Sequence, residues 1–334
     1  MFVRRIATSL VLVLLSLAVN GLAYAAPPDG AATSKQLLPT NNPEIFAFPT
    51  PPKGFDPRGA SDEDLAAFGI PPRPPIIDKE RYQRWVDMVG SIRTYVTPSF
   101  GTPTNIQFNN VAPNWSGTAV RASGKPFNMV WGAWVVPYVD QSDPFQMSYS
   151  SEWVGLDGVD NKQVEQMGTI QVSDKLFGDC KAIPCTYNYF AWVELFPDDI
   201  APITSVPVNA WDTMYAFIWF NGELAPGRLY FYLANKTASV GTAFTLAATH
   251  GVPGMSAEWI EERPTVNGHL PPLANFGSVT LTSMGFETAD GANYAANQNP
   301  FGPFRIDMYD GSQQLDYTVA TGATQDVITW ERSN

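Results

Sequence analysis

Short runs of alternating apolar and polar residues recur along the chain from about residue 127 to the C-terminus. They are rich in Val, Ile, Thr, Tyr, Phe and Trp, and Gly, Pro, Asn or Asp separate them; examples are FNMVWGAWVVPYV, QVEQMGTIQV, CTYNYFAWVELF, TMYAFIWF, GRLYFYLANK, FGSVTLTSM, QLDYTVA and DVITWE. Such runs are typical of half-buried strands. No long helical pattern and no alternation of strands with helices appears, so the sequence predicts an all-β antiparallel sandwich or barrel.

The segment before this region has a different pattern. Residues 26–105 hold 14 of the 29 prolines, and stretches such as PTPPKGF and IPPRPPII predict extended, poorly packed chain. One helix is predicted over about Asp78 to Ile92, because Tyr82, Trp85, Val86 and Val89 share one face at helical spacing. The acidic run at 61–64 predicts the start of a second, short helix.

The first 25 residues have the features of a secretion signal. Arg4 and Arg5 precede an apolar run over 10–19, and Ala23-Tyr24-Ala25 is a small-x-small cleavage site. We therefore expect a protein that is secreted to the exterior or the periplasm and keeps no membrane segment in its mature form. Export permits a disulfide, and Cys180 and Cys185 are spaced for a small-loop bridge.

Charge and composition exclude several classes of function. The 334 residues carry a net charge of −12, which disfavours nucleic-acid backbones, and two histidines with two cysteines cannot form a three-histidine or multi-cysteine metal site. Residues 106–334 contain 10 basic and 23 acidic residues and nine of the ten tryptophans. The shift predicts a signal peptide (1–25), a pro-segment (26–105) and a mature domain (106–334). A linker or wall-spanning stalk is the alternative for the middle part.

Candidate chemistry rests on carboxylates and amides. No GxSxG, HExxH or phosphate-binding glycine loop occurs, and both histidines lie in loops flanked by Gly or Pro. Strand alternation instead places polar and aromatic residues on shared faces: Trp153, Gly155 and Asp157; Gln166 and Gly168; Ser256 and Glu258; Trp192 and Glu194. Faces this polar and notched suit the floor of a cleft, although a solvated outer face would give the same pattern.

Several motifs then resemble one family in order and sequence. They are NWSG at 114–117, SEWVGLDG at 151–158, EQMG at 165–168, SAEWIEE at 256–262, FGSVTLTS at 276–283 and MYDGSQQLDYTV near the C-terminus. Together they resemble glutamic peptidases of the eqolisin type, peptidase family G1, over about residues 110–331. The resemblance implies a secreted acid endopeptidase made as a precursor. It also implies a concanavalin-like sandwich of two large curved sheets with the active site on one concave face.

The resemblance carries over to individual residues. It implies that Gln166 and Glu258 are catalytic, and it implies that four further residues line the cleft, namely Trp115, Trp153, Asp157 and Glu194. It implies no metal and no organic cofactor, protein or peptide substrates, and a monomer. The pro-segment is expected to act as an intramolecular inhibitor, with its helix docked on the cleft. The spacing from WVGLDG to the glutamine is one residue shorter than the family pattern, and the cysteines are placed differently.

Two other classes remain open at this level. A secreted glycan hydrolase or lectin-like binder would also use a concave, tryptophan-rich face, with Glu258 and either Glu194 or Glu152 as its carboxylate pair. A glycosidase has no evident need for Gln166, whereas a peptidase needs it as a hydrogen-bond donor. The remaining alternative is a non-catalytic envelope or matrix protein built on the same scaffold.

Overall fold

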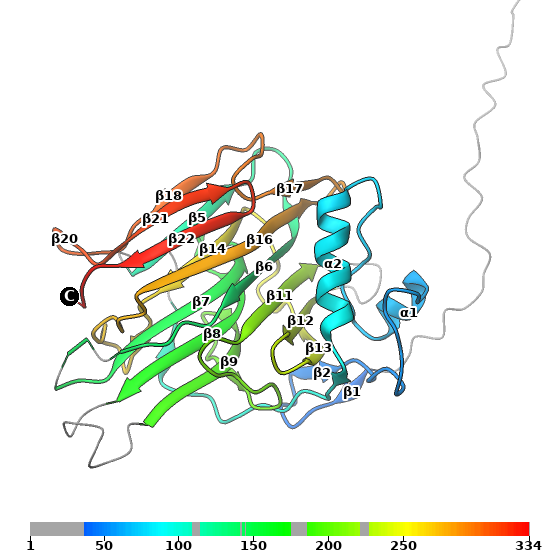
Figure 1. The fold of residues 1–334 in the computed structure, drawn as a ribbon, viewed down its shortest axis with the longest axis horizontal. Coiled ribbons are helices and arrows are strands. Elements are labelled where there is room, and N and C mark those ends of the chain that lie inside the picture. The colour runs from blue at the N-terminus through cyan, green and yellow to red at the C-terminus, as the bar shows by residue number, and fades with distance from the viewer. Residues whose placement is uncertain are drawn as a thin grey trace, which may run out of the picture. The chain divides into compact units, whose positions relative to one another are not determined.

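The described part of the chain is almost entirely strand. The structure is a computed structural model that describes residues 37–108, 114–140, 142–143, 145–174, 186–220 and 227–333. All of them belong to one compact unit, Lys35–Asn334. Within these ranges the chain has two helices, α1 (Asp62–Ala67) and α2 (Lys79–Ser91). The all-β fold class is confirmed, and Figure 1 shows the strands as two layers.

Two sheets dominate the described residues. The large sheet has the order β1 (Leu38–Pro39), β2 (Ile45–Ala47), β13 (Val240–Ala247), β12 (Arg228–Asn235), β11 (Thr213–Phe220), β6 (Phe127–Val135), β16 (Ser278–Thr288), β22 (Gln325–Trp330) and β21 (Asp316–Gly322), with β3 (Thr94–Tyr95) joined to β13 and β17 (Asn293–Ala295) to β16. The small sheet has the order β10 (Ala201–Ile203), β9 (Thr186–Phe196), β8 (Val164–Asp174), β7 (Ser148–Leu156), β14 (Ser256–Glu262), β5 (Trp115–Arg121) and β18 (Phe304–Ile306). Two short ribbons complete the described strands: β4 (Ile106–Gln107) with β15 (Thr265–Val266), and β19 (Tyr309–Asp310) with β20 (Gln313–Gln314). Apart from the β3–β13 pair, these pairings are antiparallel, as predicted.

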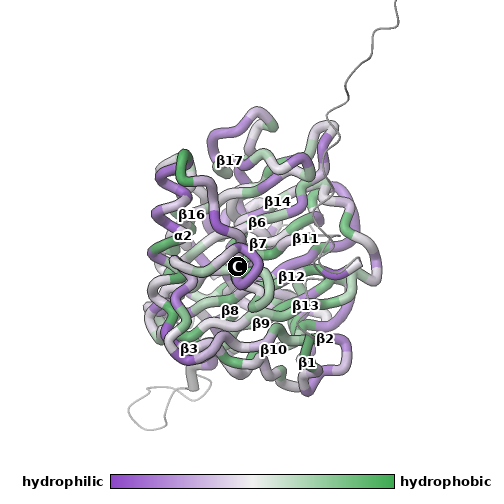
Figure 2. Tube along the Cα trace, turned by 90° about the vertical axis from the view of Figure 1, so that its right-hand side faces the viewer, coloured by the Kyte–Doolittle hydropathy of each residue, from purple (hydrophilic) through white to green (hydrophobic). Residues whose placement is uncertain are grey.

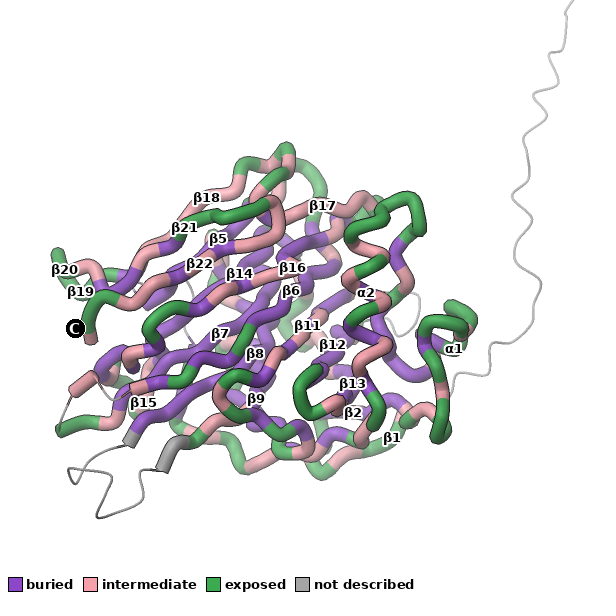
Figure 3. Tube along the Cα trace, in the orientation of Figure 1, coloured by how far each residue is buried: buried purple, intermediate pink, exposed green. Residues whose placement is uncertain are grey.

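The period-2 pattern divides the side chains between two faces of each sheet. In β7, Val154 and Leu156 enter the core between the sheets, while Tyr149 and Trp153 join an aromatic cluster on the outer face of the small sheet. Apolar and polar positions therefore follow one another along the strands (Figure 2). The central strands are buried on both faces, and exposed residues gather at loops and at α1 (Figure 3).

The helix α2 covers the outer face of the large sheet. It begins after its N-cap Asp78, whose side chain accepts a hydrogen bond from the backbone N–H of Arg81. Its buried residues Trp85, Met88 and Val89 lie in one apolar cluster with residues of β6, β11, β12 and β13. Trp131, Trp219, Tyr230 and Tyr232 are among the residues that the helix and its flanking segment cover.

The proline-rich segment is packed more closely than its composition predicts. Its strands β1, β2 and β3 extend the large sheet beyond β13, and Phe48 and Ile70 are buried. The Trp85 indole donates a 3.0 Å hydrogen bond to the Pro71 carbonyl oxygen. A sheet edge supplies backbone partners for short extended stretches, and proline is tolerated there, so these residues find partners without long strands of their own.

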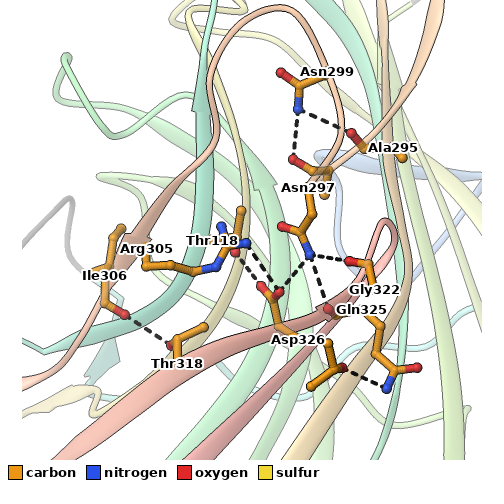
Figure 4. A network of polar contacts seen from close by, with 12 residues as sticks. Thr118, Ala295, Asn297, Asn299, Arg305, Ile306, Thr318, Gly322, Gln325 and Asp326 are labelled. Atoms are coloured by element: carbon orange, nitrogen blue, oxygen red, sulfur yellow. Dashed lines mark hydrogen bonds and ion pairs between the residues drawn. The ribbon is translucent and has the colours of Figure 1, made fainter.

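A buried polar network joins the two sheets beside β5. The carboxylate of Asp326 on β22 accepts hydrogen bonds from the Thr118 hydroxyl on β5 and, at 2.8 Å, from the Asn297 amide. Arg305 on β18 places Nη2 3.9 Å from the same carboxylate (Figure 4). The network fixes β5, the immediate neighbour of β14, against the large sheet.

Two sequence predictions lie outside the described residues. The signal segment, residues 1–25, is one, and the pair Cys180 and Cys185 is the other. Within the described ranges, neither helix is both long and apolar enough to cross a membrane.

Candidate active site

A single row of residues crosses four strands of the small sheet. Glu258 on β14 lies opposite Gly155 on β7, Gly155 lies opposite Gln166 on β8, and Gln166 lies opposite Glu194 on β9. Residues that face one another in a sheet project to the same side, so these side chains share the outer face of the small sheet. The Cα atoms of Gln166 and Glu258 are separated by two strand spacings, or about 10 Å.

Gly155 leaves the position between the two polar side chains without a side chain of its own. A Cβ atom at Gly155 would lie 2.8 Å from the Trp153 ring, which leans over this position. Any larger residue would therefore collide with Trp153. The space over Gly155, between Gln166 and Glu258, is therefore bounded by the Trp153 ring and the Val164 side chain.

Gln166 is oriented by its neighbour on β9. Its Nε2 donates a 2.5 Å hydrogen bond to Glu194 Oε2, and both side chains are buried. One N–H of the amide remains for another acceptor, because the NH₂ group has two hydrogens. The Gln166 Oε1 atom has no hydrogen-bond partner among the described residues. Glu194, predicted to line the cleft, thus holds the amide of Gln166.

Glu258 is a fully buried carboxyl group. Neither of its oxygens forms a hydrogen bond of good geometry within the described part of the chain. Burial raises the pKa of Glu258 well above its ordinary value, and the charges of Asp157 and Glu165 add to the rise, whereas the Ser256 hydroxyl opposes it.

The NWSG and WVGLDG motifs meet in one aromatic corner. The rings of Trp115 and Trp153 contact edge to face, with centroids 4.8 Å apart. Glu262 accepts hydrogen bonds from the Trp153 indole at 2.9 Å and from the Asn114 amide at 2.8 Å. The two tryptophans lie where a cleft wall was predicted, and both are fully buried.

Asp157 is bonded to the backbone of the turn that precedes β14. Its carboxylate accepts 2.8 Å hydrogen bonds from the backbone N–H groups of Gly254 and Met255 and from the Asn161 amide. Its backbone has a positive φ of 69° at the end of β7. These bonds fix the turn that leads into β14, so Asp157 positions the strand of Glu258 and has little capacity left to bind substrate.

The sequence reasoning did not single out three residues of this face. Glu262 lies four residues after Glu258, so strand parity already places it on the same face. Trp192 was placed beside Glu194 by the same alternation but was given no role. Phe108 carries no sequence signal, because its segment reaches the site only through the pairing of β4 with β15.

The predicted docking of the helix on the cleft is wrong. The helix α2 packs on the outer face of the large sheet, whereas Gln166 and Glu258 lie on the outer face of the small sheet. Its apolar face matches the aromatic residues of β6, β11 and β12 there.

The carboxylate pairs needed by a glycosidase are not assembled. Glu152 shares the inner face with Val154 and binds Thr169, whereas Glu258 points to the outer face. Glu194 lies three strand spacings from Glu258, about 14 Å between Cα atoms, with Gln166 between them. Glycosidases need two carboxyl groups that face the same bond, about 5–9.5 Å apart. Glu152 and Glu258 lie on opposite faces, and Gln166 separates Glu194 from Glu258 along the row. Among the described residues no cluster of three or more His, Cys, Asp or Glu is arranged to hold a metal ion.

Comparison with known proteins identifies the family. A family model with the description "Peptidase A4 family" matches residues 113–330. The chain belongs to the Peptidase A4 family. The match begins one residue before Asn114 and covers the residues of the row and the aromatic corner, whereas the proline-rich segment precedes it.

Solved structures give the same fold for this Peptidase A4 chain. A scytalido-glutamic peptidase with a transition state analogue inhibitor is 18% identical, with 65% of this chain and 98% of that chain covered and a TM-score of 0.53. The same peptidase with a peptide-based analogue is 19% identical at the same coverage, with a TM-score of 0.50. Aspergilloglutamic peptidase from Aspergillus niger is 20% identical, covers 55% of this chain and 99% of its own, and has a TM-score of 0.46. A search of curated protein sequences gave no match.

Proposed function

We propose that this Peptidase A4 protein is an acid endopeptidase in which Gln166 and Glu258 form the catalytic pair. The observation that carries the proposal is their register: both project from the outer face of the small sheet on either side of Gly155. Gln166 Oε1 and both Glu258 oxygens are buried and lack partners among the described residues. Buried polar atoms of this kind are costly unless a ligand or a water pairs with them, so their convergence suits a shared reacting water.

The chemistry follows from the two functional groups. The ionised Glu258 takes a proton from a water molecule held with the help of Gln166 Oε1, and the resulting hydroxide attacks the carbonyl carbon of the scissile peptide bond. The free N–H of the Gln166 amide donates to the oxyanion that develops. Glu258 then gives its proton to the nitrogen as the C–N bond breaks, which returns the carboxylate to its starting state.

This pair suits acid conditions because the amide does not titrate. A free glutamate side chain has a pKa of about 4.3, so part of such a group is ionised at mildly acidic pH, whereas a histidine base would be protonated. Glu194 supports the arrangement by orienting the Gln166 amide. Trp115 and Trp153 pack against each other beside the pair and are buried.

A proteolysis assay tests this function. Purified protein should cleave casein in the acidic part of the range pH 2–7. Pepstatin should have no effect, because the site has no pair of catalytic aspartates for it to occupy. The same sample should release no sugar from β-glucan. Sugar release without casein cleavage would contradict the peptidase proposal and support the glycan hydrolase.

We also infer that the protein is secreted as a precursor and acts as a monomer on protein or peptide substrates. Incubation of the intact protein at pH 3 should create a new N-terminus between residues 95 and 113. Two observations support these bounds: the last strand paired at the edge of the large sheet ends at Tyr95, and the family match begins at 113. N-terminal sequencing after acid incubation measures this. An unchanged N-terminus, in a sample that cleaves casein, would contradict self-processing.

A further inference from the structure

A short segment of the chain crosses the catalytic face before the family domain begins. Ile106 and Gln107 form β4, which pairs antiparallel with β15 just after the strand of Glu258. The Asn105 amide donates a 2.7 Å hydrogen bond to Asn267 Oδ1, and the backbone N–H of Asn267 donates to the Asn105 carbonyl oxygen at 2.9 Å. These bonds fix the segment at one end of the site, and the next residue, Phe108, reaches into it.

Phe108 lies flat on Trp192. Their ring centroids are 3.8 Å apart and their planes differ by 12°, and Phe108 is completely buried. Trp192 is held in place by a 3.1 Å hydrogen bond from its indole N–H to the Ser151 hydroxyl. Trp192 precedes Glu194 by two residues on β9, so both side chains project from the same face. The ring of Phe108 therefore occupies an aromatic position directly beside the catalytic row.

The main chain of Phe108 also reaches this row. Burial raises the pKa of Glu194 well above its ordinary value, and the backbone N–H of Phe108 and the Gln166 amide oppose this rise. Glu194 Oε1 is buried without a hydrogen-bond partner among the described residues. Glu194 is the group that holds the Gln166 amide at 2.5 Å. A bound peptide is commonly held in this way, with a main-chain hydrogen bond for position and a pocket for one side chain.

The site around Phe108 is closed. Gln166 and Glu258 are each 0% exposed, so a substrate cannot reach them while the covering residues stay in place. Phe108 and Trp192 belong to the same buried cluster as Trp115 and Trp153, so the ring of Phe108 fills part of the face that a substrate would have to use.

We propose that Trp192 and Glu194 form a substrate subsite for an aromatic side chain, which Phe108 fills in the intact protein. The inference rests on the proposed peptidase function and adds the class of residue that the enzyme selects near the scissile bond. Trp192 stacks on the aromatic ring, and the Glu194 carboxylate receives the main-chain N–H of the same residue. Removal of Phe108 frees the subsite.

Peptide pairs test the selectivity. Internally quenched peptides that carry Phe, or Ala at the same position, are scanned through the positions around the cleaved bond with the acid-activated enzyme. At one position the Phe peptide should have a kcat/KM about 10- to 100-fold higher than the Ala peptide, the range expected for burying one aromatic side chain. Trp192→Leu should reduce this ratio several-fold while the Ala peptide is still cleaved. Equal rates for Phe and Ala at every position would overturn the proposal.

Whether Phe108 fills the subsite is tested with the intact protein. Phe108→Ala should raise the initial rate of peptide cleavage before any processing is visible on a gel. Phe55→Ala is the matched control, because Phe55 also belongs to the N-terminal segment but packs against Phe68 in the cluster on the large sheet. Equal initial rates for Phe108→Ala and Phe55→Ala would overturn the occupancy. Absence of cleavage of every peptide would instead contradict the peptidase function, so the two failures are distinguishable.

Discussion

Glu258→Gln is expected to lower kcat for casein or peptide cleavage at pH 3–4 by about 10³-fold, the middle of the range of about 10²–10⁴ for loss of a general acid–base group. The substituted amide has nearly the same shape but cannot take a proton from water. KM should change little, because Glu258 contacts the reacting water and not the substrate side chains. Gln166→Ala should cost about 10²–10³-fold, as for loss of an oxyanion donor in other hydrolases.

Glu152→Gln is the matched control for this substitution. It makes the same chemical change on β7, the strand next to Glu258, but on the inner face of the sheet, where Glu152 binds Thr169 and Gln171. It should retain nearly full activity. The circular dichroism of the three variants should match that of the unsubstituted protein. Casein cleavage by Glu258→Gln at a rate close to that of the unsubstituted protein would reject the catalytic pair.

The free energy of unfolding is expected to fall as pH rises from about 4.5 to about 7. The layer between the sheets contains several buried carboxyl groups, among them Glu152, Glu261 and Asp316. Burial raises the pKa of Glu152 to about 7 and that of Asp316 to about 7, and it raises the pKa of Glu261 well above its ordinary value. The neighbouring Glu152 carboxylate, directly opposite on β7, adds to the rise for Glu261.

The direction of this change in the free energy of unfolding follows from the number of protons that each state binds. Between the unfolded and folded pKa values the folded protein binds more protons than the unfolded chain, so each added unit of pH favours unfolding. Each of these carboxyl groups stabilises the fold fully below its pKa in the unfolded chain, and this stabilisation is lost as pH rises through its pKa in the folded protein. At pH 7 the loss is on the order of 3 kcal/mol for each of Glu152 and Asp316. Exposed Asp56 and Asp290 have pKa values lowered by hydrogen bonds from Arg58 and Lys125, so they act in the opposite direction, at lower pH.

Urea unfolding of Glu258→Gln at pH 3.5, 5 and 7 measures this effect in a background without self-digestion. The added substitution Glu261→Gln should flatten the decline, because an amide keeps the hydrogen-bonding shape without the titration. Glu63→Gln, in the exposed first turn of α1, should leave the decline as it was. A midpoint that stays constant or rises from pH 4.5 to 7 would disprove the role of these buried acids.

The local pattern of apolar and polar residues predicts the strands and the helix, whereas the order of strands in the sheets decides which residues meet. Alternation places Gln166, Glu194 and Glu258 correctly on their own strands, and helical spacing gives α2 within a residue of its bounds. No local rule says that β14 and β8 both flank β7, and only that order brings Gly155 between the two polar side chains. The partner of α2 was mispredicted for the same reason, because an apolar helix face does not specify which sheet it covers.

Long-range contacts also account for the residues whose roles changed. Asp157 resembles a cleft residue in its motif, but the N–H groups of Gly254 and Met255, almost a hundred residues away, take its carboxylate. Phe108 lies in a segment without periodicity, and only the pairing of β4 with β15 brings it to Trp192. Such roles depend on which distant segments meet, and one sequence does not specify that.

The way the N-terminal segment extends the large sheet bears on what maturation would produce. β1, β2 and β3 complete the edge at β13, and α2 shields Trp131, Trp219 and Tyr230 on that sheet. Cutting one peptide bond after Tyr95 breaks none of these contacts. The part of the leader up to Tyr95 would then stay attached to the mature domain, because its departure would expose an aromatic surface and an unpaired strand to water. A cut after Phe108 would leave only the short end of the leader that carries Phe108 free to move out of the site.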